Sequence, residues 1–207
     1  MITIANNTAI RFLTIICAVF ILTSCSSSPN SSFYLLKAKE PGTGDNIIVD
    51  FDQSIIVGPI ALPDYLKREE IIFRSEAHQV TVADYHRWAE PLDRRITTLI
   101  ASNLSARFGA EKVIDYYANF TSSPDITVRV RISEFGPTTD GEVELLATWE
   151  IANRNAREPA LFSADISTQV ASGRVAADDV AAAVDAMNRA LNELSDDIAD
   201  SILTTSS

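Results

Sequence analysis

Neighbouring carboxylates are the side chains whose spacing could support acid–base chemistry. They occur as three pairs, Asp50 with Asp52, Asp178 with Asp179, and Asp196 with Asp197. Asp50 and Asp52 would share one side of a strand, where two carboxylates could divide the roles of glycoside hydrolysis. With 28 acidic residues in the chain, such pairs also arise by coincidence as solvated surface groups. A hydrolase that uses Asp50 and Asp52 is therefore the least favoured of three functional hypotheses.

Metal and cofactor chemistry lacks support. His78 and His86 lie eight residues apart, outside any HExxH array, and no cysteine is free to join them as a ligand. The segment Gly42-Thr43-Gly44 lacks the rest of a phosphate-binding loop, and no GxSxG, P-loop or GxGxxG string occurs. The sequence predicts a protein that is not an enzyme, with no catalytic residues, no metal and no cofactor.

Arginines and aromatic residues gather near the start of a predicted helix. Arg87, Arg94 and Arg95 make a small basic patch, which we expect to pair with local acids rather than to bind anions. Trp88 precedes Leu92 by four residues, as a hydrophobic staple would, which favours a place in the core. If Trp88, Tyr85 and nearby Tyr65 were exposed instead, they would mark a surface for a partner.

The composition is that of one acidic globular domain. The 207 residues are 46% hydrophobic, and 17 Lys and Arg oppose 28 Asp and Glu, for a net charge of −11. This apolar content and length suit a single domain with its own core. The net charge argues against nucleic acid as a partner, because phosphate binding needs clustered Lys and Arg.

The amino terminus predicts export. Residues Phe12–Leu22 form an apolar run of 11 residues that is too short to span a membrane, which needs about 20, and that matches a signal-peptide core. Leu22-Thr23-Ser24-Cys25 follows and resembles the bacterial lipobox. The resemblance implies that residues 1–24 are removed and that Cys25 is acylated at its sulfur and new amino group. The alternative is an ordinary secretory signal that leaves Cys25 as a free thiol.

Residues 25–32 would then be the lipidated cysteine and a polar, flexible tether. No disulfide is possible, since Cys17 leaves with the signal. Ser26 follows the lipobox cysteine. By resemblance to enteric lipoprotein sorting, an aspartate at this position would retain the protein at the inner membrane. We therefore expect an outer-membrane lipoprotein that faces the periplasm, with residues 33–207 as its domain.

Alternation and turn residues predict the strands. Period-two alternation is clearest in 126–133, 142–152 and 161–170, which predicts an antiparallel meander with a turn from Gly136-Pro137 to Gly141. Further strands are expected at 33–36, 47–57, 71–73, 79–82 and 112–117, with Lys39–Asn46 as a loop. We expect Gly58-Pro59 to end the strand that precedes it.

Two amphipathic helices complete the prediction. One follows Pro91 and ends at Gly109, and the other runs from Val180 to Ile202 with apolar residues at steps of three and four. The fold class is α+β: a single domain with a mixed or mostly antiparallel sheet and two helices on one face.

Four strings carry a resemblance to a known family. They are Val57–Ile71 (VGPIALPDYLKREEI), His86–Leu92 (HRWAEPL), Phe33–Leu36 (FYLL) and Ala186–Leu191 (AMNRAL). Together with the lipobox they resemble the PqiC-type family of ABC-transport auxiliary lipoproteins across the mature chain. Lys67 departs from the pattern, at a position where a smaller or acidic residue is expected.

The resemblance implies a non-enzymatic role in an intermembrane lipid-transport system. It implies an MCE-domain transport protein (PqiB-like) as partner and support of envelope integrity. Our leading hypothesis adds a homo-oligomeric ring as an expectation. The corresponding motif residues are a structural corner or a docking surface: Pro63, Tyr65, Leu66, Arg68 and Trp88. The second hypothesis is a stand-alone periplasmic protein that binds lipid in an apolar pocket between helix and sheet.

Overall fold

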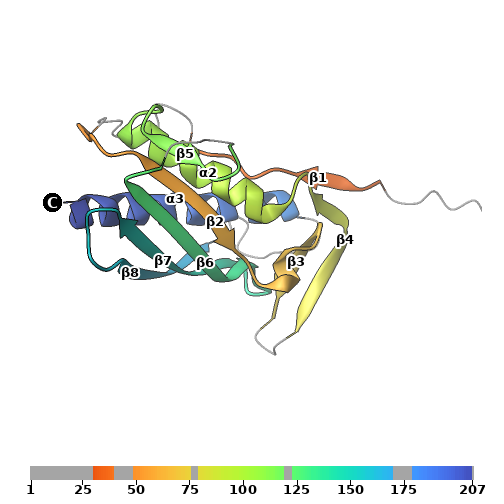
Figure 1. The fold of residues 1–207 in the computed structure, drawn as a ribbon. Coiled ribbons are helices and arrows are strands. Elements are labelled where there is room, and N and C mark those ends of the chain that lie inside the picture. The colour runs from red at the N-terminus through yellow and green to blue at the C-terminus, as the bar shows by residue number, and fades with distance from the viewer. Residues whose placement is uncertain (1–29, 40–48, 76–78, 119–122, 170–178, 207) are drawn as a thin grey trace, which may run out of the picture. The chain divides into compact units, whose positions relative to one another are not determined.

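The computed structural model describes residues 30–39, 49–75, 79–118, 123–169 and 179–206, and the chain from Ser31 onward forms one compact unit. The described strands form two sheets (Figure 1). The three-stranded sheet has the order β1 (Ser32–Tyr34), β4 (Val80–Trp88) and β3 (Glu70–Arg74). The five-stranded sheet has the order β5 (Val113–Asp115), β2 (Ile55–Ala61), β6 (Ile126–Pro137), β7 (Glu142–Asn153) and β8 (Ala160–Gln169).

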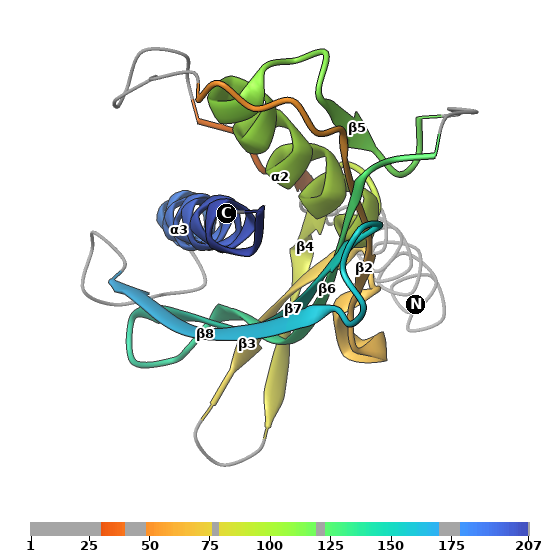
Figure 2. The same cartoon turned by 60° about the vertical axis from the view of Figure 1, so that its left-hand side comes forward.

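Two helices cover one face of the five-stranded sheet. Helix α2 (Leu92–Phe108) packs on β2 and β5, and helix α3 (Val180–Ser206) packs on β6, β7 and β8. Figure 2 shows both helices on the concave side of that sheet. The predicted α+β class with two helices on one face is confirmed, and the structure adds that the strands divide between two sheets.

Strict alternation along β7 explains how the sheet builds the core. The side chains that face the helices are at most 4% exposed: Val143, Leu145, Ala147, Trp149 and Ile151. Strands β6 and β8 pair with β7 antiparallel, in the predicted meander, while β2 pairs parallel with β5 and β6. A one-residue slip would turn this apolar set toward solvent, so burial specifies the register.

Helix α2 follows its predicted bounds, α3 is longer than predicted, and the two helices contact each other through polar groups. Helix α2 begins after Pro91 and ends at Gly109, where φ is 96°, and α3 extends to Ser206, beyond the predicted end at Ile202. Asn103 of α2 donates from Nδ2 to Oδ1 of Asn192 at 2.9 Å and to Oγ of Ser195 at 3.0 Å. These bonds satisfy polar side chains between two otherwise apolar helix faces.

One predicted break is wrong, and one predicted turn is shorter than expected. Strand β2 starts only at Ile55 and continues through Gly58-Pro59 to Ala61, with a register shift between Val57 and Ile60. Strand β6 includes Gly136 and ends at Pro137, so the predicted turn is present but is confined to 138–141. The physical reason at Gly58-Pro59 is a bulge, which absorbs the missing N–H of proline and lets the strand resume.

Several predictions fall on residues outside the described ranges. They are the signal peptide 1–24, Cys25 with most of its tether, and the predicted loop from residue 40 to Asn46. The single residues His78, Val170 and Asp178 also lie outside the described ranges. Of the tether, Asn30, Ser31 and Ser32 are described, and they are exposed. Within the described residues, the structure contains no helix with the length and hydrophobicity that crossing a membrane would require.

Candidate functional site

The segment Pro63–Arg68 forms the corner between the two sheets. A 3₁₀ helix, η1 (Asp64–Leu66), connects β2 to β3, and Pro63 precedes it with φ −63° and ψ 153°. Leu66 turns inward and is 5% exposed, whereas Lys67 pairs with Asp64 at 2.6 Å on the surface. Proline at this place supplies a backbone already suited to the turn.

The five predicted motif residues divide between core and surface. Leu66 and Trp88 are buried in the core, and the backbone N–H of Trp88 donates to the backbone carbonyl of Glu69 at 2.7 Å. Pro63 and Tyr65 are half-buried, and Arg68 is exposed with Nε 3.3 Å from Oε2 of Glu70. The core position of Trp88 follows its expected packing, while Tyr85 is 47% exposed, so these two aromatics do not form one surface.

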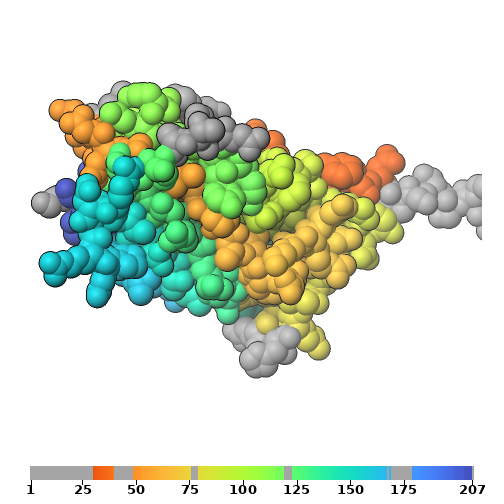
Figure 3. Space-filling model, in the orientation of Figure 1, coloured from red at the N-terminus to blue at the C-terminus, as the bar shows by residue number. Residues whose placement is uncertain are grey.

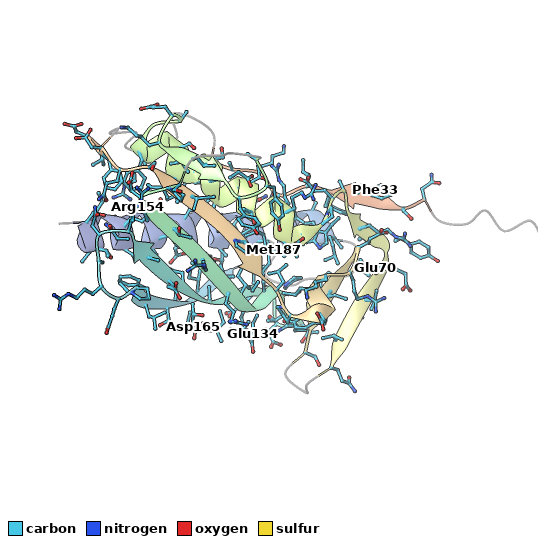
Figure 4. All side chains as sticks on the ribbon, in the orientation of Figure 1. Phe33, Glu70, Glu134, Arg154, Asp165 and Met187 are labelled. Atoms are coloured by element: carbon cyan, nitrogen blue, oxygen red, sulfur yellow. The ribbon has the colours of Figure 1, made fainter. Side chains whose placement is uncertain are left out.

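A pocket of about 730 Å³ lies where the two sheets meet. Arg74 at the end of β3 forms a parallel bridge with Thr138, next to the end of β6. The lining is largely polar: Tyr65, Arg74, Ser75, Gln79, Val80, Ser133, Glu134, Thr138, Asp140, Glu142 and Glu144. Figure 4 shows Glu134 on the side of the five-stranded sheet next to β3. Tyr65 is the one predicted motif residue in this lining.

Arg74 is the electrostatic centre of the pocket. Its guanidinium forms ion pairs with Glu134 of β6 and Glu144 of β7, and its side chain is 19% exposed. Burial lowers the pKa of Arg74, but hydrogen bonding and attraction from Glu134, with smaller contributions from Tyr65 and Glu144, outweigh it and raise the pKa. The partners lie 60 and 70 residues away in sequence, so no local pattern could have found them.

We expect Arg74→Gln to destabilise the fold by about 1–2 kcal/mol, because two carboxylates would stay side by side without their cation. Arg129→Gln is the matched control, since Arg129 also pairs with a glutamate across β6 and β7, at 2.6 Å from Glu150, but its side chain is 55% exposed. An exposed pair of this kind contributes less than about 1 kcal/mol. Urea unfolding of both variants measures the difference, and equal losses would contradict the role given to Arg74.

The predicted carboxylate pairs do not form an acid–base site in the described residues. Asp50 and Asp52 are exposed and precede β2, so their expected place on one side of a strand is wrong. Asp196 pairs with Lys39 at 2.5 Å. Asp197 is partly buried, and burial, then repulsion from Asp200 and Asp196, raises its pKa above the usual 3.8.

Asp197→Asn is expected to raise the unfolding midpoint at pH 7. A raised folded-state pKa means that ionisation of Asp197 costs stability once the pH exceeds its folded-state pKa. The benefit of the substitution should therefore be full at pH 7, fade as the pH falls through the raised folded-state pKa, and be lost by the ordinary unfolded-state value of about 3.9. Asp196→Asn is the control and should not raise the midpoint, since it removes the ion pair with Lys39. Thermal unfolding between pH 7 and pH 4 tests the sign.

The predicted basic patch pairs locally. Arg87 lies 3.6 Å from Glu69, and Arg95 lies 3.4 Å from Glu90 and also donates to the Leu36 carbonyl at 2.5 Å. Arg94 stacks over the Tyr117 ring at 4.9 Å. The expectation that these arginines pair with nearby acids is confirmed for Arg87 and Arg95.

His86 has a structural partner. Its Nδ1 lies 2.8 Å from the Tyr34 hydroxyl, and the two rings contact each other between β1 and β4. No group of three His, Cys, Asp or Glu side chains in the described part of the chain could hold a metal ion.

Two solved structures share the fold. A crystal structure of an uncharacterised protein superposes with a TM-score of 0.67 at 20% identity, over 84% of this chain and 99% of that one. A Xanthomonas campestris protein superposes with a TM-score of 0.61 at 13% identity, over 81% and 92% of the two chains.

Curated relatives and a family model give a more specific assignment. The chain is 24% identical to the intermembrane transport lipoprotein PqiC of Escherichia coli over 139 residues, 67% of this chain and 72% of that protein. The PqiC of Shigella flexneri matches equally. The model of the ABC-type transport auxiliary lipoprotein component matches residues 34–199, from the end of β1 into α3. The chain therefore belongs to the family of ABC-type transport auxiliary lipoprotein components, as its sequence strings predict.

Proposed function

We propose that this protein is a lipid-anchored, non-enzymatic component of an intermembrane lipid-transport system. The match of residues 34–199 to a transport auxiliary family carries the proposal, and the relatives of known name are intermembrane transport lipoproteins. The lipobox at Leu22–Cys25 supports acylation of Cys25, and Ser26 supports residence in the outer membrane, with the domain in the periplasm. In the periplasm the domain would dock an MCE-domain transport protein and so support envelope integrity.

The corner Pro63–Arg68 is the proposed docking surface. Leu66 and Trp88 are anchored in the core, so they hold the corner in place rather than contact a partner. Arg68, with 53% of its side chain exposed, and the half-buried Tyr65 present polar groups beside a well-packed turn. An exposed arginine on a rigid base is a residue type favoured at the energetic centre of protein interfaces.

Affinity purification of the tagged lipoprotein from mildly solubilised envelopes tests the proposal. We expect an MCE-domain protein to be recovered with it, and Arg68→Glu to lower that recovery at least about tenfold, as loss of about 1.4 kcal/mol of binding does. Arg129→Glu is the matched control, because Arg129 has 55% of its side chain exposed and also pairs with one glutamate.

Recovery of the wild-type lipoprotein without any MCE-domain protein would contradict the proposed function. Equal losses in the Arg68 and Arg129 variants would contradict only the assignment of the corner as the docking surface. Native mass spectrometry of the detergent-solubilised protein tests the associated proposal of a homo-oligomeric ring, which requires one discrete mass above that of the monomer.

A stand-alone lipid-binding protein is the second candidate. It would need an apolar pocket that accepts an acyl chain, whereas the pocket of about 730 Å³ is lined by Arg74 and several carboxylates. That lining favours a polar ligand. Bound lipid in native mass spectra of the Cys25→Ala protein would support the second candidate.

A further inference from the structure

The strands β1 and β4 present one face to the core and the other to solvent. They pair parallel, with Phe33 opposite Arg87 and Tyr34 opposite Trp88. Trp88 is 8% exposed and Tyr34 packs against the core, so this pair marks the inner face. Since paired residues share a face, Phe33 and Arg87 project outward.

The outer face carries exposed apolar side chains. Phe33 is 66% exposed and Leu35 is 41% exposed, whereas Leu36 between Leu35 and Lys37 is fully buried, so alternation continues past β1. Tyr85 is 47% exposed and directly precedes the inward His86. We call Phe33, Leu35 and Tyr85 the β1–β4 patch. Figure 3 shows β1 and β4 gathered at one end of the domain surface, and Figure 4 places Phe33 there.

Basic side chains accompany the β1–β4 patch. Lys37 is exposed two residues after Leu35, and 37% of the Arg87 side chain is exposed. The sequence from Cys25 to Lys39 contains no acidic residue, although the whole chain has a net charge of −11. Acidic residues lie there too, since Glu69 is 3.6 Å from Arg87 and the exposed Asp84 precedes Tyr85. The aromatic and aliphatic side chains together with the long basic ones, rather than a net positive charge, therefore give the patch the chemistry of the lipid–water interface.

The position of the proposed lipid anchor indicates that the bilayer surface is what contacts this patch. Phe33 lies eight residues after Cys25. Eight residues reach at most about 28 Å when fully extended, and a flexible chain of that length spans about 16 Å on average. Acyl chains on Cys25 would therefore hold Phe33 close to the bilayer, at a high effective concentration of lipid surface.

We propose that Phe33, Leu35 and Tyr85 form a membrane-contact surface that rests in the interfacial region of the bilayer and orients the domain on it. This inference rests on the proposed acylation of Cys25. The contact would turn the β7–β8 end away from the membrane, since Arg154 at that end lies across the domain from Phe33 (Figure 4). A tether alone would leave the domain free to rotate, whereas this contact would set the direction in which it faces a transport partner.

Single-cysteine labelling of the full-length lipoprotein tests the proposal. Cys17 would leave with the signal and Cys25 would be acylated, so Leu35→Cys and Tyr85→Cys each introduce the one reactive thiol of the mature chain. Leu161→Cys is the control, because Leu161 is 77% exposed and is the second residue of β8, near the Arg154 end. Each protein carries an environment-sensitive fluorophore and is reconstituted into vesicles of phosphatidylethanolamine and phosphatidylglycerol. Unchanged thermal unfolding confirms that each variant is folded.

We expect labels at 35 and 85 to shift to shorter emission wavelengths in vesicles and to be quenched at least about twofold by headgroup-proximal spin-labelled lipid, while the label at 161 is not. Equal exposure of all three labels to aqueous iodide, with Cys25 unreactive, would overturn the contact surface alone. If the labels at residues 35 and 85 are protected from iodide in detergent micelles as well, and this protection rises with protein concentration, the patch mediates self-association and the membrane-contact proposal is overturned. A reactive thiol at Cys25 in the wild-type protein would overturn both this inference and the anchor on which it rests.

Discussion

Cys25→Ala is expected to abolish incorporation of labelled palmitate into this protein. The thiol of Cys25 is the acceptor that the lipobox predicts, and alanine has no nucleophile to replace it. The loss should be complete rather than partial, because acylation of the amino group requires that the chain first be cut before residue 25. Metabolic labelling followed by immunoprecipitation measures it, and an intact mass of the wild-type mature protein gives the number of acyl chains.

Cys17→Ala is the matched control for this experiment. Cys17 lies in the apolar core of the predicted signal, and the mature protein would not contain it. We expect wild-type palmitate incorporation and wild-type mature mass in that variant. Labelling that survives Cys25→Ala, or that is lost in Cys17→Ala, would refute the assignment of the anchor. Several acyl chains hold a protein on a membrane essentially permanently, whereas a single chain gives marginal binding.

Leu145→Ala is expected to destabilise the domain by about 2–5 kcal/mol. Leu145 is fully buried in β7, on the sheet face covered by the helices. Truncation to alanine removes buried methyl groups and leaves a cavity that a β-sheet held in register by two neighbouring strands can fill only in part. Urea unfolding of the mature chain carrying Cys25→Ala measures the change without interference from acyl chains.

The next residue in the chain provides the control. Leu146 points to the opposite face of β7 and is 36% exposed, so Leu146→Ala should cost less than about 1 kcal/mol. The same chemical truncation one residue apart therefore separates burial from strand propensity. Equal costs at 145 and 146 would show that the face assignment of β7, and with it the register of the meander, is wrong.

Glycine–proline pairs mark the limit of local prediction in this fold. Gly58-Pro59 suggests a strand end, yet β2 runs through it to Ala61, whereas β6 does end at its own pair, at Pro137. Gly58 is held there by tertiary contacts: φ is 111°, and a Cβ at this position would lie 2.9 Å from the Tyr116 Cβ. The neighbouring segment that requires glycine lies 58 residues further along the chain, so a short sequence window contains no sign of it.

The candidate docking corner likewise combines a feature that the sequence predicts with one that only the structure reveals. The motif residues from Pro63 to Arg68 are expected at a structural corner, and the structure has a 3₁₀ helix there. The residues of this segment do not indicate that Tyr65 lines a pocket with Arg74. They also do not indicate that Arg74 pairs with Glu134 and Glu144 in the other sheet. The pocket at the junction of the sheets therefore emerged from the structure alone.

The helices, the meander and the family of this protein could be predicted from the amino-acid sequence, because they depend on periodicity and on strings of adjacent residues. The alternation of β7 and the steps of three and four in α3 each follow from the backbone geometry of one element. The division of the strands into two sheets, the exposed side chains that share a face and the long-range ion pairs were visible only in the folded molecule. Those features depend on the pairing of segments distant in the chain, which is selected by the burial of the whole core.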